Sequence, residues 1–321
     1  MKKLLKYSAL FLLIAIAALV SYVKFALPNV GPPEQLTIES TPERVERGWY
    51  LANSVCVCMD CHSTRDWSRF SGPLTEGTLG KGGETFDQKF GFPGQFYSKN
   101  LTPFGIGDWT DGELLRAIGS GVSKNGKALF PVMPHASYGN MEREDLYAII
   151  AYLRSLTPIN HVVPQSSADF PMSLIINTIP KKAEYKKQIH AENALVHGEY
   201  IFNAAACGDC HTKQDKGKPV AGMELAGGFE FPLPTGGVVR SSNITPDKET
   251  GIGNWTEEGF VKRFKQYADS GYTPHVVAKG TFNTTMPWMM YRNMSEADLK
   301  DLFTYLQHVK AVSNSVEKFT N

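Results

Sequence analysis

The chain has 321 residues, with 33 Lys and Arg against 32 Asp and Glu and a formal net charge of +1. This near balance argues against a nucleic-acid-binding protein, in which a basic excess is expected. Hydrophobic residues make up 42% and charged residues 20%, so the chain can form a packed core and wholesale disorder is excluded. Five cysteines are too few for a disulfide-rich scaffold, whereas 29 glycines and 19 prolines predict long structured loops. The length predicts about two domains.

An apolar segment near the start predicts contact with a membrane. Three lysines within the first six residues precede an uncharged run at residues 7–23. As a helix this run spans about 26 Å, close to the roughly 30 Å hydrocarbon core of a bilayer. The lysines are expected to stay inside, so the following chain is translocated. Residues 1–30 are therefore an uncleaved transmembrane anchor or a signal peptide. We favour the anchor, because Lys24 and Phe25 follow at once and no clean small-x-small cleavage site is present.

The chain after the anchor is a tandem repeat. Its recurring motifs are Arg47-Gly48-Trp49-Tyr50-Leu51 with His197-Gly198-Glu199-Tyr200-Ile201, Asn100-Leu101-Thr102-Pro103 with Asn243-Ile244-Thr245-Pro246, Gly105-Ile106-Gly107-Asp108-Trp109-Thr110 with Gly251-Ile252-Gly253-Asn254-Trp255-Thr256, and Met133-Pro134 with Met286-Pro287. Because the order is preserved, we predict two copies of one domain, at residues 42–157 and 195–312. The linker at residues 158–194 is predicted to contain a short helix at residues 181–190.

Helical periodicity exceeds any strand signal in both copies, so we predict an all-α fold. The predicted first, middle and last helices cover residues 42–54, 111–119 and 142–156 in one copy and residues 194–206, 257–269 and 295–309 in the other. Apolar residues in the last helices follow helical spacing. Gly48 and Gly198 are expected to let the first helix of each copy cross the last one closely, against Tyr152 and Tyr305. Each unit is thus predicted to be a small helical domain whose loops wrap around a central group.

Two short cysteine motifs indicate what that group is. Each copy contains C-x-x-C-H, the attachment pattern of c-type haem. Two thiols three positions apart lie on the same side of a helical turn and can bond the porphyrin edge, and the adjacent histidine directs its imidazole at the iron. The predicted attachment residues are Cys58, Cys61, Cys207 and Cys210, and the predicted iron ligands are His62 and His211.

Other interpretations of these cysteines are weaker. A four-thiolate zinc site usually keeps its two pairs near each other, whereas Cys61 and Cys207 are far apart in the chain. A thioredoxin-type centre requires a βαβ context, and a disulfide in each pair leaves both histidines unexplained. Cys56 has no counterpart in the second copy. It is expected to be a small buried residue; a partner for Cys58 or Cys61, or an alternative haem thiol, are the other interpretations.

Each haem iron needs a second axial ligand or remains open. Met133 and Met286 occupy equivalent places, each followed by proline and a last helix, and are the predicted sixth ligands. A thioether raises the reduction potential relative to a second imidazole, which suits an electron carrier. Met289 and Met290 are rivals to Met286, and His135 is a rival to Met133. Core packing is the ordinary role of a methionine.

Further repeated residues are expected to surround the haems. Pro103 and Pro246 are predicted to present a backbone carbonyl to the histidine N–H, which would fix the imidazole. Trp109 and Trp255 are predicted to form a wall of each haem site. Ordinary packing explains each of these residues equally well.

The joined motifs resemble those of the cytochrome c subunits of bacterial membrane-bound alcohol and gluconate dehydrogenases. The shared pattern covers most of residues 45–156 and 195–309 and reads [RH]-G-x-Y-[LI], C-x-x-C-H, N-[LI]-T-P, G-I-G-[DN]-W-T, M-P and a closing Y-L helix. The resemblance implies class I cytochrome c domains with His and Met ligands. Subunits of that family typically carry three haem domains, whereas this chain has two, so the resemblance leaves the particular partner open. Dihaem cytochromes of this type also occur as free-standing carriers.

These features predict a dihaem c-type cytochrome, with two covalently bound haem c groups, that transfers single electrons. The expected donor is a membrane-associated dehydrogenase, and the expected acceptor is a respiratory cytochrome or oxidase. The expected location is the periplasmic face of a bacterial inner membrane, or the periplasm if the N-terminal segment is cleaved. The alternative is a peroxidase-like dihaem enzyme, which needs one displaceable iron ligand. The chain has no G-x-G-x-x-G fingerprint after a strand, so it is not expected to bind flavin or nicotinamide.

Overall fold

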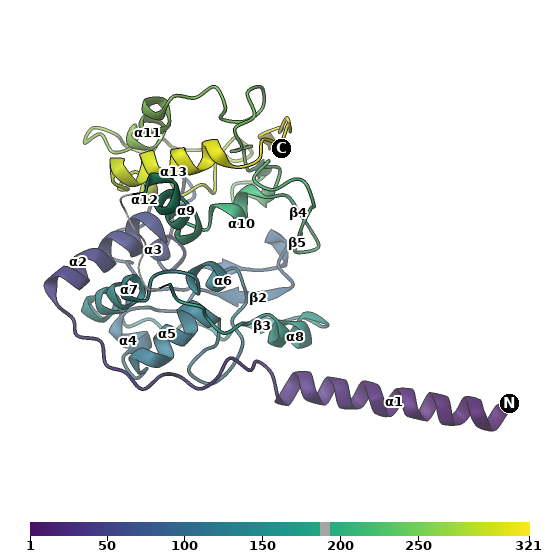
Figure 1. Cartoon of the computed structure of the whole chain (residues 1–321). Helices are drawn as coiled ribbons and strands as arrows, with labels where there is room; N and C mark the ends of the chain where they lie inside the picture. The colour runs from purple at the N-terminus through teal and green to yellow at the C-terminus, as the bar shows by residue number, and fades with distance from the viewer. Residues whose placement is uncertain (187–192) are drawn as a thin grey trace.

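The computed structural model describes residues 1–186 and 193–321. Helix α1 (Lys2–Phe25) projects away from the rest of the molecule and carries the N-terminus at its far end (Figure 1). Its most apolar window has a mean hydropathy of 2.2, and none of its residues is buried. The helix spans about 36 Å, so it is long and apolar enough to cross a membrane. A signal sequence near an N-terminus satisfies the same criterion.

The predicted helices are present in both halves of the chain, which we call the first repeat (residues 42–157) and the second repeat (residues 195–312). The first repeat contains α2 (Pro42–Tyr50), its π-helical continuation η1 (Leu51–Val55), α3 (Cys58–Cys61), α4 (Pro103–Ile106), α5 (Asp111–Ser120), α6 (His135–Tyr138) and α7 (Arg143–Ser155). The second contains α9 (Ala194–Ala204), α10 (Cys207–His211), α11 (Glu257–Lys265), α12 (Trp288–Tyr291) and α13 (Glu296–His308). Helices α2, α5, α11 and α13 each begin with a hydroxyl side chain that accepts a hydrogen bond from a backbone N–H of the first turn. These capping residues are Thr41, Thr110, Thr256 and Ser295.

The first and last helices of each repeat cross at backbone contact, as predicted from the glycines. A Cβ added at Gly48 would lie 1.9 Å from the carbonyl oxygen of Ala148 and 2.8 Å from the Cβ of Tyr152. A Cβ added at Gly198 would lie 2.0 Å from the carbonyl oxygen of Asp301. Only glycine allows this approach, so the expectation of a close α2–α7 and α9–α13 crossing is confirmed (Figure 1).

The expectation of an all-α fold is confirmed only in part, because the described residues also form three small antiparallel sheets. They contain β1 (Thr85–Phe86), β2 (Gly94–Tyr97) and β3 (Ser167–Ala168); β4 (Gln214–Asp215) and β5 (Lys218–Pro219); and β6 (Glu230–Pro232), β7 (Val238–Arg240) and β8 (Phe319–Thr320). Strand β2 pairs with β1 through Thr85 opposite Tyr97, and β7 pairs with β8 through Val239 opposite Phe319. Strands of two to four residues are too short to show a clear alternating pattern in the sequence.

The segment between the repeats is more than a connector. Strand β3 adds to the sheet of the first repeat, and the chain then forms α8 (Met172–Ile175) and the 3-10 turn η3 (Ile176–Thr178). Both lie against α1, in which Val23 is partly buried. The short helix predicted at residues 181–190 is not formed at residues 181–186, and its remainder lies outside the described residues. A further 3-10 turn, η2 (Gln88–Phe90), precedes β2.

The two repeats share one continuous hydrophobic core, and their contact is reciprocal. The Tyr200 hydroxyl of the second repeat donates to the Asp145 carboxylate of the first, at 2.5 Å. The equivalent Tyr50 hydroxyl of the first repeat donates to the equivalent Asp298 of the second. Arg47 also bonds Asp145, at 2.7 and 2.8 Å. Because each tyrosine contacts the aspartate at the start of the other repeat's last helix, the repeats are related by an approximate two-fold arrangement.

The glycine crossings predict a strong stability effect. Gly48→Ala should lower the free energy of unfolding by about 1–3 kcal/mol, because the new methyl group forces α2 away from α7. Thermal unfolding followed by circular dichroism measures the change. The matched control is Gly271→Ala, since Gly271 is exposed and a Cβ there meets no atom closer than 3.4 Å. Equal melting temperatures for both variants would contradict the crossing.

Candidate functional site

Each C-x-x-C-H motif begins after a residue in the left-handed backbone region. Val57 has φ of 45° and Ala206 has φ of 50°, a conformation unfavourable for residues that carry a Cβ. This conformation separates the first helix of each repeat from a new short helix, α3 or α10, which carries both cysteines. All four motif thiols are free, and burial raises the pKa of Cys58 and of Cys207 to about 12. Both motifs thus present protonated thiols on a single helical turn.

The adjacent histidines are held in one tautomer. The Nδ1 atom of His62 lies 2.7 Å from the carbonyl oxygen of Lys99, and that of His211 lies 2.8 Å from the carbonyl oxygen of Ser242. A carbonyl oxygen only accepts, so each Nδ1 carries the proton and each Nε2 keeps its lone pair. Desolvation lowers the pKa of both rings, which keeps them neutral at pH 7. A neutral imidazole with a free Nε2 is the form that ligates iron.

The carbonyls that fix the two imidazoles are not those that the sequence predicted. Pro103 and Pro246 were expected to supply them, but Lys99 and Ser242 do so. Each lies immediately before the repeated N-[LI]-T-P motif. In the second copy of that motif, for example, the Asn243 side chain accepts the N–H of Thr245 at 2.9 Å. The motif therefore shapes the loop whose preceding carbonyl reaches the histidine.

Met133 and Met286 lie in matching turns. Pro134 has φ −77° and ψ 57°, and Pro287 has φ −80° and ψ 63°, which are the angles of an inverse γ-turn. The expected hydrogen bond of this turn runs to each methionine carbonyl, from the His135 N–H at 2.7 Å and from the Trp288 N–H at 2.8 Å. Both methionines are half-buried and pack against the hydrophobic core. The turn therefore presents the methionine at the same place in each repeat.

A buried tyrosine joins each methionine turn to the cysteine turn of its own repeat. The Tyr138 hydroxyl donates to the carbonyl of Cys56 at 2.9 Å, and the Tyr291 hydroxyl donates to the carbonyl of Ala205 at 3.1 Å. Burial, followed by the nearby Cys58 thiol, raises the pKa of Tyr138. Burial and then the Cys207 thiol do the same for Tyr291. Neither tyrosine was predicted from the sequence, although both stand in a repeated M-P-x-x-x-Y pattern that could have revealed them.

The rival ligands are placed differently from the two methionines. Met289 and Met290 are buried in α12, and Met290 belongs to the main core. His135 is 3% exposed, its ring packs on Gly121, and its Nε2 has no hydrogen-bond partner among the described residues. Its position corresponds to Trp288 in the second repeat, which cannot ligate iron. Equivalence of the two turns therefore favours Met133 over His135.

Cys56 is a small buried residue. It is 3% exposed, its thiol is free, and its Sγ lies 3.8 Å from the Sδ of Met141. Burial raises its pKa well above the usual value. This environment fits a packing role.

The surroundings of the two cysteine turns differ in charge. In the first repeat Arg65 pairs with Asp60 at 2.9 Å and with Glu84 at 2.7 Å, and its guanidinium lies 4.4 Å from the ring centroid of Trp67. Asp209, which corresponds to Asp60, forms no ion pair with any described residue. No sequence signal pointed to Arg65, because it has no counterpart in the second repeat.

Burial raises the pKa of Cys210 to about 12, with smaller contributions from Asp209 and from Cys61 of the other repeat. The two predicted haem walls are unequal, since Trp109 packs half-buried against the core whereas Trp255 is 41% exposed. Their role at the haem stays a prediction.

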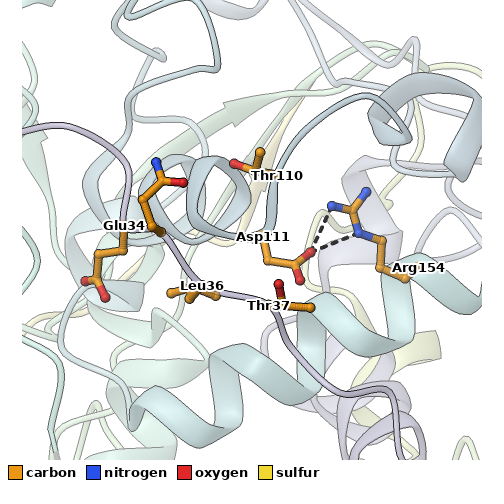
Figure 2. A pocket seen from close by; sticks show the side chains of 7 residues that line it. Glu34, Leu36, Thr37, Thr110, Asp111 and Arg154 are labelled. Atoms are coloured by element: carbon orange, nitrogen blue, oxygen red, sulfur yellow. Dashed lines mark hydrogen bonds and ion pairs between the residues drawn. The ribbon is translucent and has the colours of Figure 1, made fainter.

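One open pocket lies away from these motifs. Figure 2 shows it, between the segment after α1 and the first repeat, with Arg154 and Asp111 paired at 2.9 Å. The Asp111 carboxylate also accepts the N–H of Ile38 at 2.8 Å. Because these polar groups form hydrogen bonds with one another, the pocket marks the contact between the segment that follows α1 and the first repeat.

Comparisons with known proteins point in the same direction. The Cytochrome c family model matches residues 195–310. The chain is 27% identical to the gluconate 2-dehydrogenase cytochrome c subunit of Pantoea cypripedii, over 86% of this chain and 62% of that protein. It is 27% identical to the fructose dehydrogenase cytochrome subunit of Gluconobacter japonicus, over 90% of this chain and 57% of that protein. It is 28% identical to a dihaem cytochrome c-type protein of Cereibacter sphaeroides, over 79% of this chain and 82% of that protein.

The first two relatives are longer, so this chain spans only about three fifths of their length. The similarity nevertheless extends over most of this chain and includes both repeats. The resemblance predicted from the motifs is therefore confirmed: this chain is similar to the cytochrome c subunits of dehydrogenases, and its second repeat matches the cytochrome c family.

Proposed function

We propose that this chain is a dihaem c-type cytochrome that transfers single electrons. The observation that carries the proposal is the repeated unit of one cysteine turn, one histidine with a free Nε2 and one methionine turn, joined by a buried tyrosine. The same unit occurs twice with equivalent residues. A haem c bound in such a unit supplies a reversible one-electron couple.

The residues present fit this cofactor. Cys58 and Cys61 would hold one haem through thioethers, and Cys207 and Cys210 the other. His62 and His211 would ligate iron through Nε2, because their Nδ1 protons are engaged by backbone carbonyls. Met133 and Met286 would supply the sixth ligands.

The proposed organisation is a membrane anchor or signal segment at residues 1–30, two cytochrome c domains at residues 42–157 and 195–312, and a linker at residues 158–194. The similarity to a dihaem cytochrome over 82% of its length supports two haems rather than three. The hydrophobic core that the two repeats share supports electron exchange between the two sites.

The proposed donor is a dehydrogenase, and the proposed acceptor is a respiratory cytochrome or oxidase. The names of the dehydrogenase cytochrome subunits among the relatives support the donor. We propose that α1 anchors the protein in the inner membrane, with both repeats on the periplasmic side. The hydropathy of α1 and the lysines at its start support this orientation.

Replacing either methionine should affect one haem only. Met133→Ala and Met286→Ala should each lower one of two midpoint potentials, because a thioether ligand is lost, while both haems stay covalently attached. A spectroelectrochemical titration measures the potentials, and the ferric methionine-to-iron charge-transfer band reports the bond itself.

The matched controls are Met141→Leu and Met294→Leu, since both side chains are 1% exposed and pack in the core. These controls should leave both potentials in place. An unchanged titration in both alanine variants would show that the ligand assignments are wrong, and high-spin ferric haem in the unsubstituted protein would favour the peroxidase-like alternative.

The number of haems can be counted by mass. Intact-mass spectrometry of the mature protein should show the added mass of two haem groups. Cys207→Ser or Cys210→Ser should weaken attachment in the second repeat only, because each haem is held by its own motif. A mass without haem, or loss of both haems from a single substitution, would count against the proposal.

The anchor can be tested on α1. The mature protein should retain residues 1–25 and stay in the membrane after alkaline extraction. Leu13→Arg should reduce the membrane-bound fraction, because an arginine near the middle of a spanning helix costs about 2.5–3.5 kcal/mol. Leu5→Arg is the control, since a charge near the helix end can reach the lipid headgroups. A mature chain that begins after residue 25 would show that the segment is a signal peptide.

A further inference from the structure

A loop of the first repeat docks on the second repeat immediately after the first C-x-x-C-H motif. This docking loop comprises residues 67–72. The N–H of Phe70 donates to the carbonyl of His275 at 2.9 Å, and the N–H of Val277 donates to the carbonyl of Ser68 at 2.7 Å. The Phe70 ring stacks on His275 with centroids 5.1 Å apart and forms a second small core with residues of the second repeat, Tyr267, Val277 and Met289.

Within the docking loop, one hydroxyl bridges the turn that presents Met286. Ser71 is 3% exposed, and its Oγ donates to the carbonyl of Met286 at 2.7 Å. The same Oγ accepts the N–H of Trp288 at 3.0 Å. These two groups are the ends of the inverse γ-turn, so Ser71 holds both ends from outside the second repeat. Its own backbone has φ of 62°, a left-handed conformation that is unusual for serine.

A buried amide locks the docking loop to the segment before the methionine. Asn283 is fully buried, and its side-chain oxygen accepts the N–H of Ser71 at 2.9 Å. Its side-chain nitrogen donates to the carbonyls of Trp67 and Arg69, at 3.3 and 3.2 Å. On the other side, the Thr284 Oγ1 accepts the N–H of Met286 at 3.0 Å. The segment from Asn283 to Trp288 is therefore hydrogen-bonded to the first repeat at Asn283, Met286 and Trp288.

The turn around Met133 has no such support. Its internal hydrogen bond from the N–H of His135 is present, but no described residue of the second repeat forms a hydrogen bond with residues 133–135. The two methionine turns thus have the same backbone shape and different surroundings.

We propose that the docking loop is a positioning element for the second haem site, and that Ser71, with Asn283, keeps Met286 on the iron. This inference rests on the proposed role of Met286 as a ligand. A ligand whose turn is braced by buried hydrogen bonds from another part of the chain is displaced less easily, because leaving the iron would break those bonds. The strength of the Met286–iron bond is then a property of both repeats together, whereas no described hydrogen bond from the second repeat braces the turn of Met133.

The experiment is an imidazole titration of the ferric holoprotein, followed by the methionine-to-iron charge-transfer band. The variants are Ser71→Ala and Ser71→Gly, made in the Met133→Ala background so that the remaining band reports Met286. The glycine variant keeps the backbone conformation without strain, since glycine tolerates φ of 62°. The control is Ser68→Ala, because the exposed Ser68 side chain bonds Asp66 within its own loop.

We expect imidazole to displace Met286 about tenfold more readily in both Ser71 variants than in the control, a change equal to about 1.4 kcal/mol. Loss of the Met286 band before imidazole is added would support the same conclusion more strongly. In the Met286→Ala background, the Ser71 variants should leave imidazole binding at the Met133 site unchanged. Intact mass and thermal unfolding of each variant establish that both haems are attached and that the fold is retained.

Equal imidazole affinity in the Ser71 variants and the control would overturn the inference, as would an equal shift at both sites, which indicates general loosening. If Ser71→Ala fails to fold, Ser71→Gly decides. Absence of any methionine-to-iron band in the unsubstituted protein would instead overturn the proposed ligand set, so the two failures are distinguishable.

Discussion

The backbone contact between the first and last helix of each repeat is the constraint on which the two sites depend. At Gly48 and Gly198 there is no room for any side chain, so α2 and α9 lie directly on α7 and α13. The first helix ends about one to two turns beyond this contact, and the left-handed residue after it directs the cysteine turn. The last helix in turn follows the methionine turn in the chain. Both halves of each site are therefore built outward from a single crossing.

The repeats share this framework but differ in what surrounds it. The reciprocal tyrosine–aspartate contacts make the pair nearly symmetric at its centre. Away from the centre, Arg65 gives the first cysteine turn an ion-pair network that has no counterpart among the described residues around the second, and the docking loop bonds the second methionine turn. If both sites hold haem with the proposed ligands, their different local charge and support would favour different potentials, and electron flow between them would then have a direction.

The sequence was sufficient for those features that side chains specify locally. The helices follow from apolar spacing, the cysteine turns from C-x-x-C-H, and the close crossings from Gly48 and Gly198. It was insufficient where the interaction is made by a backbone group or by residues far apart in the sequence. The carbonyls of Lys99 and Ser242 hold the histidines, and a carbonyl is common to every residue, so no pattern marks it. The contact of Ser71 with Met286 joins parts of the chain far apart in sequence, and only the fold brings them together.

The segment that follows α1 restricts how the two repeats can move relative to α1. It does not swing freely, because Ile38 bonds Asp111 and Glu34 pairs with Arg143 at 2.7 Å, while α8 lies beside the end of α1. With α1 in a bilayer, the two repeats would be held close to the membrane surface and would keep one face toward the lipid. Such a carrier would not travel between distant partners through the surrounding fluid. Its partners would have to meet it by two-dimensional diffusion in the same membrane, or remain joined to it.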